Sequence, residues 1–153
     1  MKKLIVIVLS ILTISAVASA QPKAVGLRGG YGAQLSYEHF SNAFGGDFLE
    51  FEVGLSSFNA LHAEALVNYA LAGNAGAGFC FYAGYGAAAG FNFGENAGIN
   101  VAAAAQVGIE YTFPVPVQIS LDIRPMLGIT TAVEKGAGLY LGYYPAFGIR
   151  YAF

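Results

Sequence analysis

The chain has 153 residues, of which 56% are hydrophobic and only 10% are charged, and its formal net charge is −2. This length suits a single domain, and an acidic chain without a lysine or arginine cluster is a poor candidate for binding nucleic acid or anionic lipid. The single cysteine, Cys80, excludes an intrachain disulfide. We expect Cys80 to be a small side chain that is either buried or facing the wall of the fold.

The first residues have the three-part pattern of a cleavable secretory signal peptide. Two lysines precede an apolar run over residues 4–14, and small residues then end at Ala20. An N-terminal membrane anchor is the alternative, but the apolar run is too short to span a bilayer. We therefore predict a signal peptide at 1–20 and one mature domain at 21–153, with five basic and nine acidic residues.

Bulky side chains alternate with small or polar ones along the mature chain. The charge-free stretch 65–94 could be mistaken for a transmembrane helix, yet glycines crowd it, and each glycine costs a helix about 1 kcal/mol relative to alanine. Its phenylalanines also fall at odd positions only. A period of two is typical of a strand. The same alternation predicts strands, in chain order, at 24–40, 48–56, 61–71, 79–93, 99–113, 117–130 and 139–153.

Two of these strands end alike, at Phe113 and at Phe153, and Pro114 stops the first of them. If both ends lie at the same end of the sheet, the strand directions alternate from one to the next. Both termini then lie on one side, and the number of strands must be even. The segment 24–40 is either one strand or two that turn at 29–32, and two strands would make eight. The other turns at the opposite end are expected near 57–59, 94–98 and 131–138.

The alternation fits two kinds of all-β fold. A soluble sandwich would bury its apolar face, whereas a transmembrane barrel turns it outward. The export signal and the scarcity of charge favour the barrel. We predict an eight-stranded antiparallel transmembrane β-barrel, closed, preceded by the signal peptide.

The C-terminal residues Gly148, Tyr151 and Phe153 resemble the sorting signal of Gram-negative outer-membrane β-barrel proteins, which the barrel-assembly machinery recognises. More widely, residues 21–153 resemble the small Bacteroidetes-type outer-membrane barrel proteins related to OmpX and to the membrane domain of OmpA. The resemblance is carried by the segments 26–30, 37–40, 82–86 and 121–125. It implies a porin-like monomer in contact with outer-membrane lipid. Unlike OmpA, the chain is expected to carry no peptidoglycan-binding domain, and unlike OmpX-like adhesins it has no loop that looks long enough to protrude far.

Charged residues at even positions are predicted to point into the lumen of this barrel. Because buried charges are costly unless paired, the first hypothesis is a structural network of ion pairs and hydrogen bonds that fills the lumen. The alternative is a narrow gated pore for ions or small solutes, with the three arginines as plugs against an acidic wall. Since carboxylates outnumber arginines, some should lie near a mouth or have a raised pKa. The predicted lumen residues are Arg28, Glu38, Glu50, Glu52, His62, Glu64, Glu110, Asp122, Arg124 and Arg150.

Few residues of the sequence suggest a catalytic, metal-binding or cofactor-binding site. His62 has Ser56, Ser57 and Glu64 within reach, which is too loose a set to indicate a lipid-modifying enzyme, and His39 is expected to be interfacial. One cysteine and two separated histidines do not make a metal site, and no cofactor motif is present. The loops are short, with charge only at the tip 133–136, so a surface-interaction role is less favoured. The sequence therefore predicts a barrel of structural role rather than an enzyme.

Overall fold

The computed structural model describes residues 23–56, 59–93, 97–132 and 136–153. Within these residues the fold is all-β, with one short 3-10 turn, η1 (Ala43–Gly45), between the second and third strands. The strands are β1 (Lys23–Gly29), β2 (Gly32–Phe40), β3 (Phe48–Ser56), β4 (Ala60–Gly73), β5 (Gly78–Asn92), β6 (Gly98–Thr112), β7 (Gln118–Ala132) and β8 (Gly136–Ala152).

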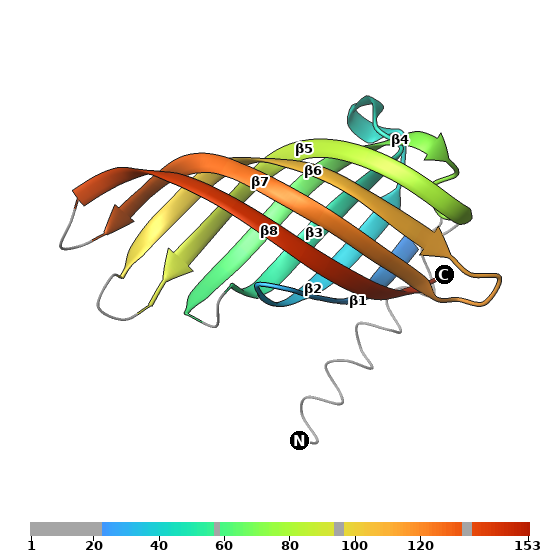
Figure 1. Cartoon of the computed structure of the whole chain (residues 1–153), viewed down its shortest axis with the longest axis horizontal. Helices are drawn as coiled ribbons and strands as arrows, with labels where there is room; N and C mark the ends of the chain where they lie inside the picture. Colours follow the sequence, from blue (N-terminus) through green and yellow to red (C-terminus); the bar gives the residue numbers. More distant parts are fainter. Residues whose placement is uncertain (1–22, 57–58, 94–96, 133–135) are drawn as a thin grey trace, which may run out of the picture.

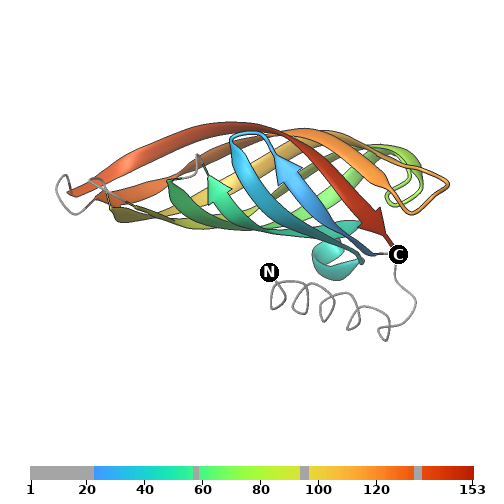
Figure 2. The same cartoon turned by 90° about the horizontal axis from the view of Figure 1, so that it is seen from below.

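The eight strands form a closed antiparallel barrel in chain order, and β8 returns to pair with β1 (Figures 1 and 2). Lys23 and Phe153 close the ring at the termini, each backbone N–H donating to the other residue's carbonyl oxygen, at 2.8 and 2.7 Å. The predicted number of strands and their antiparallel pairing are confirmed. So is the division of 24–40 into two strands. In the part of the chain that the structure describes, no helix is long and apolar enough to cross a membrane.

The two ends of the barrel differ. We call the end that holds Lys23 and Phe153 the terminal end, and the opposite end the far end. β1 pairs with β8 only as far as Gly29 and Phe147, so the first part of β8 extends past β1 at the far end (Figure 1). The loop predicted over 131–138 is too long, because β7 continues to Ala132 and β8 already begins at Gly136.

Side chains on the strands separate by parity, as the alternation predicts. On β6 the odd-numbered Ile99, Val101 and Val107 are exposed, at 56%, 57% and 55%, while the even-numbered Gln106 and Glu110 are buried. The same distribution is found on the other strands, where the exposed large side chains are mostly apolar and the large buried ones mostly polar. A soluble sheet protein has the opposite arrangement.

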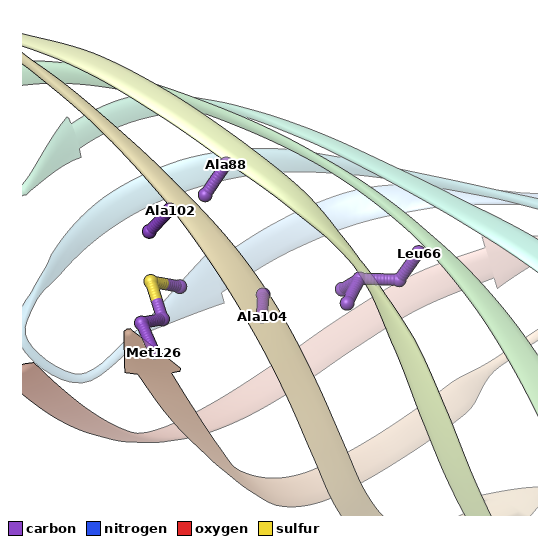
Figure 3. Packing of buried hydrophobic residues seen from close by; sticks show 5 residues of the cluster. All are labelled: Leu66, Ala88, Ala102, Ala104 and Met126. Carbon is purple, nitrogen blue, oxygen red and sulfur yellow. The ribbon is translucent and has the colours of Figure 1, made fainter. Parts of the chain in front are cut away.

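Two apolar clusters pack inside the barrel between polar groups. One is formed by β4 to β7, whose side chains point inward in Figure 3; its members are Leu66, Ala88, Ala102, Ala104 and Met126. The other lies toward the terminal end and comprises Phe40, Phe48, Cys80 and Tyr82. The expectation that Cys80 is buried is confirmed. Tyr82 fits because position 108 is glycine, where a Cβ atom would lie only 2.6 Å from the Tyr82 ring.

Candidate functional site: a buried network of charges

The ten predicted lumen residues all have buried side chains, none more than 6% exposed. They come from β1 to β4 and from β6 to β8, so they converge on the interior from most of the ring. Each stands at an even position, where the pleat of its strand turns the side chain inward. The strand pattern therefore places six carboxylates, three guanidinium groups and one imidazole in a single enclosed space.

Arg124, on β7, is the centre of this network. Its guanidinium NH1 lies 2.7 Å from Glu64 and 2.8 Å from Glu52, and NH2 lies 2.9 Å from Glu50. Its Nε lies 3.3 Å from Asp122 on the same strand. The side chain is fully buried, so these four carboxylates replace the water that the guanidinium loses.

Arg28, on β1, reaches across β8 to the same group of acids. Its Nε donates to Asp122 Oδ2 at 3.2 Å and NH2 donates to Asp122 Oδ1, which makes a two-point pair. Its NH1 lies 2.8 Å from Glu52 and donates to Gln34 Oε1 at 3.4 Å. Two-point pairs of this kind fix the orientation of both side chains.

Arg150, on β8, anchors the network toward the terminal end. Its NH1 lies 2.7 Å from Glu38 and donates to Ser120 Oγ at 3.0 Å, while Nε donates to Ser36 Oγ at 2.8 Å. Its NH2 donates to Glu50. Because Glu50 also binds Arg124, and Glu52 binds both Arg28 and Arg124, the three arginines belong to one continuous network.

Glu110 differs from the other five carboxylates. Within the described residues, no arginine lies within 4.0 Å of it; its oxygens accept hydrogen bonds from Gln118 Nε2 at 3.2 Å and from the backbone N–H of Gly76 at 3.4 Å. Gly76 belongs to the turn between β4 and β5 at the terminal end, where a Cβ atom would lie 3.3 Å from the ring of Phe40. The carboxylate with the weakest cationic support therefore lies toward the terminal end of the lumen.

Neutral side chains that the sequence reasoning missed complete the network. Ser36 and Ser120 hold Arg150, Gln34 holds Arg28, and Gln118 holds Glu110. All four stand at even positions. The parity rule applied to uncharged polar residues would have found them.

His62 lies at the far end of the network, where its Nε2 is 2.9 Å from Glu64 Oε1 and its ring centre 6.4 Å from that of Tyr144. Above it opens a cavity of about 240 Å³, to which Ser56 also contributes; Ser57 lies outside the described residues. The other histidine, His39, points outward and stacks on Tyr37 with ring centres 6.4 Å apart.

The described residues contain no group of three or more histidine, cysteine, aspartate or glutamate side chains arranged to hold a metal ion. At the C-terminus, Tyr151 and Phe153 are exposed and their rings stack 6.1 Å apart, while Gly148 is buried beside Ser120. Comparisons with protein-family models, with curated proteins and with solved structures find no match to this chain.

Proposed function

We propose that this chain is an integral β-barrel protein of a Gram-negative outer membrane, exported by a signal peptide at 1–20, whose lumen is closed by the network of charges. The observation that carries the proposal is the inverted distribution of side chains. Large apolar residues such as Val107 and Leu127 are more than half exposed, while Arg124 and Glu50 are fully buried. Lipid stabilises such a surface, whereas water would penalise it.

The height of the apolar surface supports this environment. On β6 the outward positions from Ile99 to Tyr111 are all apolar or aromatic. At about 3.3 Å per residue and a strand tilt of about 40°, these residues span roughly 30 Å along the barrel axis. That height is close to the hydrocarbon thickness of a bilayer, about 25–30 Å. Aromatic pairs lie toward both ends of the surface, with Tyr111 and Phe113 at the terminal end and Phe91 and Phe93 at the far end.

In this proposal both termini face the periplasm and the far end faces the exterior. The exposed Phe153 is then the lipid-facing residue that the barrel-assembly machinery would recognise during biogenesis. The His62–Glu64 pair belongs to the structure rather than to catalysis, since Glu64 also binds Arg124. We therefore propose a monomeric membrane-embedded body without enzymatic activity.

A narrow gated pore is the second candidate, and the cavity above His62 is the observation that favours it. In that case Arg124 would be the gate, and Arg124→Ala should raise the single-channel conductance of the protein in planar bilayers. The filled centre favours the closed body. Unchanged conductance in a folded Arg124→Ala protein would remove the gate hypothesis.

The membrane proposal has a direct test, because the chain contains no tryptophan. Val107→Trp places an indole on the outer surface and Tyr144→Trp places one inside the far end. In vesicles whose acyl chains carry bromine at mid-depth, we expect strong quenching at 107 and little at 144. A lower gel mobility after boiling serves as the check on folding. Equal quenching at the two positions in folded protein would exclude the proposed orientation of the faces.

A further inference from the structure

The far end of the lumen holds a cavity that the proposed function does not use. It measures about 240 Å³ and lies above the charged centre. Residues from β3 to β8 and the β1–β2 turn line it, so it is the central mouth of the barrel rather than a gap between two strands. A volume of this size exceeds many times the 10–15 Å³ or so that one water molecule requires. It would hold a small molecule of about a dozen non-hydrogen atoms.

The chemistry of the lining is unlike that of the centre. Among the described residues that line the cavity, none is an aspartate, glutamate, lysine or arginine, and His62 supplies the only imidazole. Asn92 and Asn100 supply carboxamides, and Thr130 a hydroxyl. These groups both donate and accept hydrogen bonds, which suits a ligand that carries many hydroxyl groups.

Aromatic rings form one wall of the cavity. Tyr144 contacts Tyr31 edge to face, with ring centres 5.4 Å apart, and packs together with Tyr140 against the apolar cluster below. Such rings offer an apolar face and a phenolic hydroxyl at one site. A sugar ring has the same two properties, an apolar C–H face and a polar rim.

The arginines beneath the cavity are not free to bind an anion. Six buried carboxylates face three arginines in the described part of the lumen. All three guanidinium groups are already held by carboxylates, as Arg124 is by Glu64. Among the described residues, an anionic ligand would therefore find no free cation. A cation would in turn find no carboxylate among the lining residues that the structure describes.

We propose that this cavity, which we call the vestibule, is a binding site for a small neutral polyhydroxylated ligand of the monosaccharide class. The site goes beyond the membrane proposal and exists in detergent as well as in lipid. For a ligand of this size in a shallow site, the dissociation constant should be about 1 mM.

The test is calorimetric titration of the folded full chain in detergent with D-glucose and N-acetyl-D-glucosamine. D-glucuronate and inorganic phosphate serve as the anionic probes. Tyr144→Phe removes one hydroxyl from the vestibule, and Tyr143→Phe removes one from the adjacent outward-facing ring, which is 62% exposed. Asn100→Ala removes a carboxamide from the vestibule.

We expect saturable binding of at least one neutral sugar, weakened about three- to tenfold by Tyr144→Phe and by Asn100→Ala and unchanged by Tyr143→Phe. D-glucuronate should bind at least about tenfold more weakly than D-glucose, because its carboxylate would lose water without gaining a free cationic partner. The proposal is overturned if the folded chain shows no saturable binding of either sugar below about 50 mM. Tighter binding of an anionic probe, or equal effects of the two tyrosine variants, overturns it as well. Gel mobility reports folding separately, so failure of this site is distinguishable from failure of the barrel.

Discussion

Replacing Arg124 with methionine tests the central claim about the lumen, that one arginine holds several buried carboxylates. The variant keeps much of the side-chain volume and removes the charge from a position that is fully buried between Glu50, Glu52, Glu64 and Asp122. Removing one partner of a buried ion pair costs about 3–5 kcal/mol, because the remaining charge is left without compensation.

The loss in the free energy of unfolding should not be four times that of a single ion pair, although Arg124 contacts four carboxylates. Glu52 and Asp122 keep Arg28, and Glu50 keeps Arg150, so only Glu64 loses its arginine altogether and retains His62. We therefore expect Arg124→Met to lower the free energy of unfolding by about 3–5 kcal/mol, a change of roughly 10²- to 10⁴-fold in the folding equilibrium. Adding Glu64→Gln should recover about 1–3 kcal/mol of this loss, since it removes the carboxylate charge that no longer has an arginine partner.

The assay is urea unfolding in detergent micelles, followed by the mobility difference between folded and unfolded bands and extrapolated linearly to water. Lys23→Met serves as the control, because Lys23 is only half-buried at the terminal end; its effect should stay within about 0.5 kcal/mol. If Arg124→Met does not fold, Arg124→Lys can replace it, because it keeps the charge but not the planar guanidinium group. This variant should lower the free energy of unfolding by about 1–3 kcal/mol. An Arg124→Met protein within about 1 kcal/mol of the parent would refute the reasoning.

Three further perturbations test other parts of the barrel. Gly108→Ala should lose about 1–3 kcal/mol in the same unfolding assay, because its Cβ atom would lie 2.6 Å from the Tyr82 ring, whereas Gly138→Ala meets open space and should change little. Phe48→Ala removes a fully buried ring from the cluster near the terminal end and should lose about 3–5 kcal/mol, against less than about 0.5 kcal/mol for Phe44→Ala, which is 81% exposed. Cys80 is buried, so N-ethylmaleimide should label it at least about a hundredfold more slowly in the folded chain than in urea, and this difference in rate measures opening of the barrel. The control is Leu139→Cys in the Cys80→Ser background. Position 139 is exposed, so its thiol should react quickly in both states.

The sequence predicts the strands and their inward faces well because both follow from one period. Once a closed sheet is assumed, a residue such as Glu50 must point inward if Phe51 points outward, and a shift of one residue would reverse every position on the strand. The predicted bounds of β3 match the structure, and most other ends differ by one or two residues. The start of β8 was missed because Gly136 and Gly138 look like turn residues, although both lie in the strand.

The partners within the network could not be predicted in the same way. Parity says that Arg28 and Asp122 both face the lumen, but not that they meet, because their contact depends on the stagger of β1 against β7 across β8. These two residues are 94 positions apart in the chain, and Arg150 and Glu50 are 100 apart. Height along the barrel axis is a property of the closed ring, and no single strand encodes it.

The lumen thus consists of two parts with different physical limits. In the centre, each charged side chain has lost its water and is stabilised only by its neighbours, so removing one charge weakens the pairing of the groups that remain. At the far end, the described residues that line the cavity carry no aspartate, glutamate, lysine or arginine, so they can exchange water for a ligand without leaving a buried charge unpaired. Tyr144 stands at the boundary, since it pairs with Arg124 in the ladder between β7 and β8 and packs against Tyr31 in the mouth. In such a barrel the stability depends on the centre, so the recognition that we propose at the mouth can change without loss of the fold.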